Sequence, residues 1–163
     1  AFESALYEGY GPHGVAMIVD TATDNPTRTV ANVRSAFKKE NGNLGNAGSV
    51  SFMFDQLGVF RLKPDGVERD DLELELIDHG LEELADGTND DGDPLLLIRC
   101  ARESFGAMQA ELESRKIEVD SSGFEWVPKT LAELSDEQVD EVVKLIDRLE
   151  QDDDVQEVFH NLA

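Results

Sequence analysis

Three histidines and one cysteine carry the most reactive side-chain chemistry in this sequence, and their spacing forms no familiar catalytic or metal-binding motif. His13, His79 and His160 fit neither HxxxH nor HExxH, and there is no GxSxG nucleophile elbow. Cys100 ends the largely apolar segment 95–99 (LLLIR), which is typical of a buried structural thiol. Among 36 acidic residues, a pair of carboxylates is expected by chance. We therefore predict a protein that is not an enzyme, with no metal and no cofactor.

A glycine-dense stretch near the start has the spacing of a phosphate-binding turn. Gly9, Gly11 and Gly14 match the GxGxxG pattern, in which glycines allow backbone to approach a pyrophosphate at a helix N-terminus. That chemistry needs a strand before the glycines and a helix after them. Here the strand-like run 15–19 follows the glycines, so the order argues against a dinucleotide site.

The acidic segment 86–93 has the composition of a calcium loop but not its spacing. An EF-hand needs alternating oxygen ligands, Gly at position six and Glu at position twelve, and no frame that starts at Asp86 or Asn89 supplies all three. A solvated hairpin tip is the better interpretation.

The charge is strongly acidic and unevenly distributed. The chain has a net charge of −22, which disfavours non-specific attraction to phosphate backbones. Residues 1–56 contain 6 acidic and 4 basic residues, whereas residues 118–163 contain 14 and 3. A solvated, solubilising surface explains most of the acidity. Any nucleic-acid contact should involve the nearly neutral first third, or a part of the native protein outside this sequence.

The elements that would position such a contact can be read from periodicity. We expect a strand over 15–19, then a helix capped by Asn25 with Pro26 at its first position, which ends near 41–42. Its apolar face carries Val30, Val33 and Phe37, while Arg28, Arg34 and Lys38 form a basic cluster elsewhere on the helix. A glycine and asparagine loop over 43–48 and a strand over 49–54 should follow.

The rest of the sequence continues to alternate between predicted strands and predicted helices. We expect strands over 58–63, 81–84, 95–100, 117–129 and 155–160, and helices over 70–79, 103–116 and after the capping box at Ser135 and Gln138. The order predicts an α+β fold of two ferredoxin-like βαββαβ-type domains, the second inserted into the first. The first domain would comprise 1–56 and 122–163, and the inserted domain 57–121. No apolar run is long enough to span a bilayer, and no signal peptide opens the chain, so we expect a cytoplasmic protein that does not contact membranes.

Several motifs resemble the YebC family across the whole chain. The resemblance is carried by residues 7–12 (YEGYGP), 23–30, 42–50, 127–130 and 154–161, whereas 57–121 match mainly in pattern. It implies three domains. The first, an N-terminal basic helical bundle, would come before the residues of this sequence. Bacterial members are labelled transcriptional regulators, and mitochondrial relatives are translational activators, which would place a eukaryotic member in the mitochondrial matrix.

The resemblance implies a non-enzymatic regulator of gene expression associated with the ribosome or RNA, aided by the N-terminal domain. Aromatic rings, exposed backbone and cationic side chains are suited to contact with RNA. We therefore predict a contact surface that contains Tyr7, Tyr10, Gly9, Gly11, Gly14, Arg28, Arg34 and Lys38. A solvated helix face is the alternative explanation of the basic cluster. Two alternative functions remain open: a DNA-binding transcriptional regulator and a small-ligand regulatory module.

Overall fold

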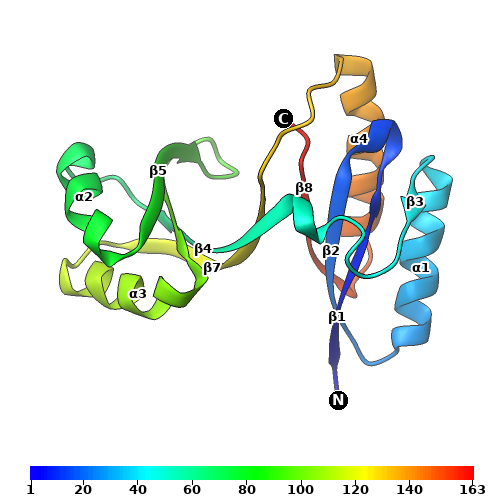
Figure 1. The fold of residues 1–163 in the computed structure, drawn as a ribbon, viewed down its shortest axis with the longest axis horizontal. Helices are drawn as coiled ribbons and strands as arrows, with labels where there is room; N and C mark the ends of the chain where they lie inside the picture. Colours follow the sequence, from blue (N-terminus) through cyan, green and yellow to red (C-terminus); the bar gives the residue numbers. More distant parts are fainter. The chain divides into compact units, whose positions relative to one another are not determined.

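The computed structural model describes residues 1–163 and divides into two compact units. Unit 1 comprises residues 1–55 and 126–163, and unit 2 comprises residues 56–125. Each unit contains one four-stranded sheet with two helices packed against it (Figure 1). This architecture confirms the predicted α+β class with one unit inserted into the other.

Unit 1 is built on an antiparallel sheet in the strand order β3-β1-β2-β8. Two helices cover one face of this sheet, because the alternating side chains of β2 and the apolar stripes of both helices form one core. Short 3₁₀ turns lie at Pro12–Gly14 and Ser51–Met53. The elements are β1 (Glu3–Tyr10), β2 (Ala16–Thr23), α1 (Pro26–Lys39), β3 (Asn43–Leu44), α4 (Asp136–Glu150) and β8 (Val155–His160).

The helix ends in unit 1 follow the sequence signals closely. Asn25 caps α1 by accepting the backbone N–H of Arg28 at 3.1 Å, and Pro26 occupies the first helical position. Ser135 and Gln138 form the predicted capping box of α4. Side-chain chemistry within a few residues determines these boundaries, which is why they were predicted correctly.

One strand prediction in unit 1 was too short and another was wrong. The predicted strand 15–19 corresponds to β2, which extends to Thr23 and pairs with β1 over all eight positions. The predicted strand 49–54 is instead a 3₁₀ turn over Ser51–Met53, followed by β4 from Phe54. A buried carboxylate on β1 binds the backbone N–H groups of this turn, so they are not available for a sheet ladder.

Unit 2 has the βαββαβ order of a ferredoxin-like domain, with strands arranged β5-β6-β4-β7. Its core lies between the sheet and both helices, around Phe60, Ile98 and Met108. Cys100 is fully buried in this core, and burial raises the pKa of its thiol, as expected for a structural cysteine. The elements are β4 (Phe54–Leu62), α2 (Arg69–Leu76), β5 (Leu81–Thr88), β6 (Pro94–Ala101), α3 (Phe105–Ser114) and β7 (Val119–Pro128), with 3₁₀ turns at Ile77–His79 and Arg102–Ser104.

Candidate nucleic-acid interface

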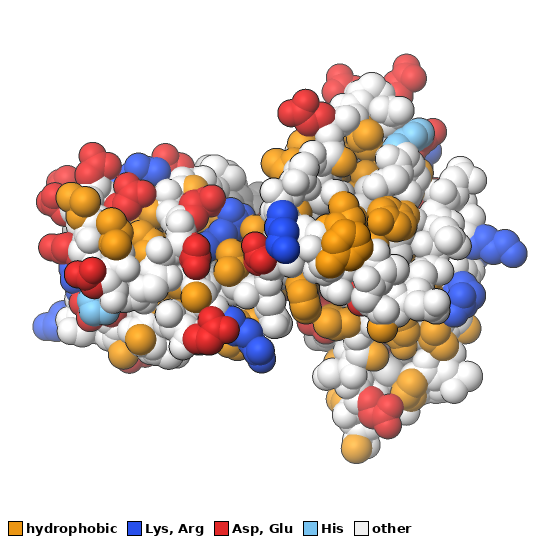
Figure 2. Space-filling model, in the orientation of Figure 1, with side chains coloured by type: hydrophobic (Ala, Val, Ile, Leu, Met, Phe, Trp, Pro, Cys, Tyr) orange, Lys and Arg blue, Asp and Glu red, His pale blue; other side chains and the backbone are white.

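The basic side of α1 is the part of unit 1 best suited to contact an anion. Arg34 and Lys38 are exposed and one helical turn apart, and neither has a hydrogen-bond or ion-pair partner. Figure 2 shows Lys and Arg side chains along the outer margin of this unit, on the side where Figure 1 places α1. These two cations are therefore available to an external partner, and the predicted contact through them stays a prediction.

Arg28 differs from Arg34 and Lys38, because it is engaged within the protein. Its guanidinium donates to both carboxylate oxygens of Asp154, at 2.9 and 3.1 Å, and to Asp24 at 3.2 Å. Thr29 donates its hydroxyl to the same Asp154 carboxylate at 2.8 Å. The Arg28 and Thr29 hydrogen bonds hold the pKa of Asp154 below its ordinary value. This network ties the start of α1 to the turn after α4, so the main contact of Arg28 is structural.

The glycines of the opening stretch serve close packing within unit 1. A Cβ on Gly9 would lie 2.6 Å from the backbone oxygen of Asn43, and a Cβ on Gly11 would lie 2.8 Å from the Met17 sulfur. Both glycines are buried. Gly14 is exposed with φ of +77°, a left-handed conformation that favours glycine. The GxGxxG spacing therefore reflects the packing of β1 against β3 and β2, together with one tight turn.

The two tyrosines point to opposite faces of the sheet. Tyr7 is half-buried against the core beneath the helices. Tyr10 is 37% exposed, and its hydroxyl lies 3.8 Å from the Met53 sulfur on the face that the helices leave free. The structure brings Arg34 and Lys38 together, but it does not gather the tyrosines and glycines around them.

Glu8 is a key residue that the sequence interpretation missed. Its carboxylate accepts backbone N–H groups of Gly48, Val50 and Ser51 at 2.8, 3.0 and 2.7 Å. Burial acts to raise the pKa of Glu8, but these three hydrogen bonds outweigh burial and lower it. Glu8 thereby fixes the loop between β3 and β4 on the sheet. An acidic residue between Tyr7 and Gly9, in the middle of a run with no other charge from Ser4 to Pro12, was the available signal.

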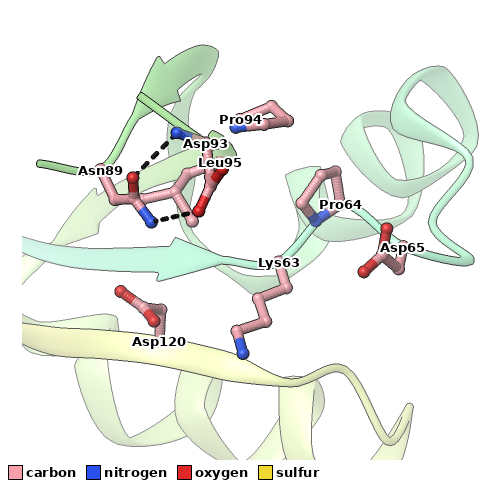
Figure 3. A pocket seen from close by; sticks show the side chains of 8 residues that line it. All are labelled: Lys63, Pro64, Asp65, Asn89, Asp93, Pro94, Leu95 and Asp120. Atoms are coloured by element: carbon pink, nitrogen blue, oxygen red, sulfur yellow. Dashed lines mark hydrogen bonds between the residues drawn. The ribbon is translucent and has the colours of Figure 1, made fainter. Parts of the chain in front are cut away.

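Unit 2 contains a cavity that is relevant to the small-ligand alternative (Figure 3). Its volume is about 380 Å³, and Asn89 donates and accepts hydrogen bonds at its rim. The Asn89 side-chain oxygen accepts the backbone N–H groups of Asp91 and Asp93, each at 2.9 Å, which makes a closed hairpin tip rather than a calcium loop. The lining residues are Lys63, Pro64, Asp65, Asn89, Asp93, Pro94, Leu95 and Asp120.

No group of three or more His, Cys, Asp or Glu side chains is arranged to hold a metal ion. No helix is long and apolar enough to cross a membrane.

Comparison with known proteins shows the family of this chain. Residues 2–162 match the family described as the TACO1/YebC second and third domain. A protein of Anaeromyxobacter dehalogenans named probable transcriptional regulatory protein is 60% identical over the whole chain, which covers 68% of that relative. A protein of the same name from Myxococcus xanthus is 54% identical over 99% of the chain and is also covered to 68%.

A solved structure supports the same assignment. The crystal structure of a conserved hypothetical protein from Aquifex aeolicus superposes with a TM-score of 0.87 at 32% identity. The match covers 99% of this chain and 65% of that one. On the evidence of sequence and fold together, the chain belongs to the TACO1/YebC family.

Proposed function

We propose that this protein regulates gene expression, without catalysis, by contacting RNA or the ribosome through Arg34 and Lys38 on α1. The observation that carries this proposal is that both cations are exposed and unpaired in a chain with a net charge of −22. On so acidic a molecule, two neighbouring free cations favour anion contact at their own position, and the surrounding acidic residues repel phosphate. The relatives are named as regulatory proteins, which agrees with a role in the regulation of gene expression.

The direct test is co-sedimentation with ribosomes for a variant that reverses both charges. We expect Arg34→Glu/Lys38→Glu to weaken association about tenfold or more and to reduce its salt dependence, because two phosphate contacts become repulsive. Lys129→Glu/Lys144→Glu is the matched control, since it makes the same change in charge in the same unit but not on α1. Equal loss in both variants would mean that net charge, not this face, determines association.

A second function, transcriptional regulation through DNA, is favoured by the names of the relatives. Duplex DNA binding depends steeply on salt, with a slope of about −0.9 for each phosphate contacted. The net charge of −22 opposes such binding by this chain. We expect gel-shift titrations with duplex DNA at several salt concentrations to show no specific shift. A sequence-specific shift that Arg34→Glu/Lys38→Glu abolishes would support transcription in place of translation.

A further inference from the structure

The outer edge of β1 is an unpaired strand edge. β1 pairs with β2 at all eight positions, but β3 covers only Gly9 and Tyr10. The segment 3–7 therefore presents backbone to solvent on the side away from β2 (Figure 1). Such an edge is a template for pairing with another strand.

One hydrogen bond fixes which backbone groups point outward. Gly45 donates its N–H to the carbonyl oxygen of Glu8 at 2.8 Å, so Glu8 faces the outer edge. Backbone groups alternate along an antiparallel strand, and Ser4 and Leu6 therefore also face outward. Their two N–H and two C=O groups have no partner within the chain.

This edge lacks the features that usually block strand addition. Residues 4–7 contain no charge, no proline and no bulge, and Leu6 is 44% exposed. The edge strand of unit 2 is different, because β5 carries Glu82, Glu83 and Asp86 and has an irregular register between Leu81 and Glu83. The contrast indicates that β1 is an open edge suited to pairing.

The basic side of α1 flanks the same edge. Arg28 pairs with Asp154, which follows α4, and Glu40 pairs with Arg148 on α4. These two ion pairs place α4 beside one side of α1. Arg34 and Lys38 lie on the opposite side by helical periodicity. The sheet order places β3 and β1 away from β8, and α1 packs against β1 and β3. The two free cations are thus on the flank where β1 is unpaired.

We propose that β1 binds an extended peptide by strand addition, and that the bound segment alternates apolar and acidic residues. Apolar side chains would pack beside Leu6 on the sheet face that the helices leave free. Acidic side chains on the other face would lie toward Arg34 and Lys38. Ser4 and Leu6 would supply up to four main-chain hydrogen bonds. A second copy of this chain is the less suitable partner, because Glu3 and the net charge of −22 oppose self-pairing.

The test uses a blocked hexapeptide, Val-Glu-Val-Glu-Val-Glu, titrated into the protein and followed by backbone amide NMR and hydrogen exchange. We expect binding to slow exchange of the Ser4 and Leu6 amides at least fivefold and to leave the Ala5 amide, which faces β2, unchanged. The same peptide N-methylated at alternate residues should not bind, because it lacks the donors that β1 needs. Leu6→Lys should weaken binding about tenfold, whereas Leu131→Lys, at an apolar residue that is 57% exposed, should not.

Three results would overturn the proposal: no binding of the alternating peptide at millimolar concentration, equal binding of its N-methylated form, or dimerisation through β1 in place of peptide binding. The N-methylated peptide keeps the test valid if Leu6→Lys does not fold. Arg34→Glu/Lys38→Glu should weaken this peptide but not one with serine in place of glutamate. Ribosome association should survive Leu6→Lys, so failure here is distinguishable from failure of the proposed function.

Discussion

Replacing Glu8 with alanine should destabilise unit 1 by about 3 kcal/mol at neutral pH. The change removes the only partner of three backbone N–H groups, and a buried donor without a partner costs about 1–3 kcal/mol. Val50 is fully buried, whereas Gly48 is exposed and can bond to water, so the total lies below the sum of three full penalties. Urea denaturation measures the difference, and Glu3→Ala on the exposed end of the same strand is the control.

The pH dependence of this effect identifies its origin. The folded-state pKa of Glu8 is lowered below its unfolded value, so the carboxylate contributes stability that is fully present above the unfolded pKa. This stability is lost as pH falls through the folded-state pKa. The difference between the protein and Glu8→Gln should therefore be largest near neutral pH and shrink in strong acid. A difference that does not change with pH would assign the effect to packing rather than to the charge.

The helices were predictable because their signals are local. Asn25, Pro26 and the Ser135 capping box act within one turn, and the apolar stripe around Val33 and Phe37 repeats at the helical period. None of these signals depends on residues far along the chain. Sequence reasoning therefore located α1 and α4 and their buried faces.

The errors in the strands arise from contacts between distant residues. Glu8 binds the loop at 48–51, about forty positions later, and this contact converts an alternating apolar run into a 3₁₀ turn. Likewise, Gly9 and Gly11 matched the spacing of a phosphate-binding turn, although the element order argued against that site. In the folded chain, β3 and Met17 come too close for any larger residue. Such contacts leave no periodicity in the sequence.

The candidate site was predictable only in part, for the same reason. Helical spacing placed Arg34 and Lys38 together, but spacing could not show that Asp154 engages Arg28 from more than one hundred residues away. It also could not show which of Tyr7 and Tyr10 faces the helices, because that depends on the sheet face that α1 and α4 cover. The candidate contact surface that remains consists of Arg34 and Lys38, and it is smaller than the predicted surface.

Gly9→Ala is the change that best separates packing from partner binding at the opening glycines. The added Cβ would lie 2.6 Å from the Asn43 oxygen and 3.0 Å from the Leu44 Cα. Both are backbone atoms, so β3 must move, and we expect a loss of about 2–3 kcal/mol in the free energy of unfolding. Gly87→Ala on β5 is the control, because its Cβ meets nothing within 4 Å, and it should be neutral or slightly stabilising.

The two explanations of Gly9 predict different pairs of measurements. If packing determines the residue, Gly9→Ala lowers stability in denaturation, and the fraction that remains folded associates with ribosomes as before. If the glycine instead admits a partner to the backbone, stability is retained and association falls. Gly9 is buried and pairs with Leu44 of β3, which favours the first outcome, since a partner would have to displace β3 to reach this edge of Gly9. Retained stability with lost association would return this glycine to the contact surface beside Arg34 and Lys38.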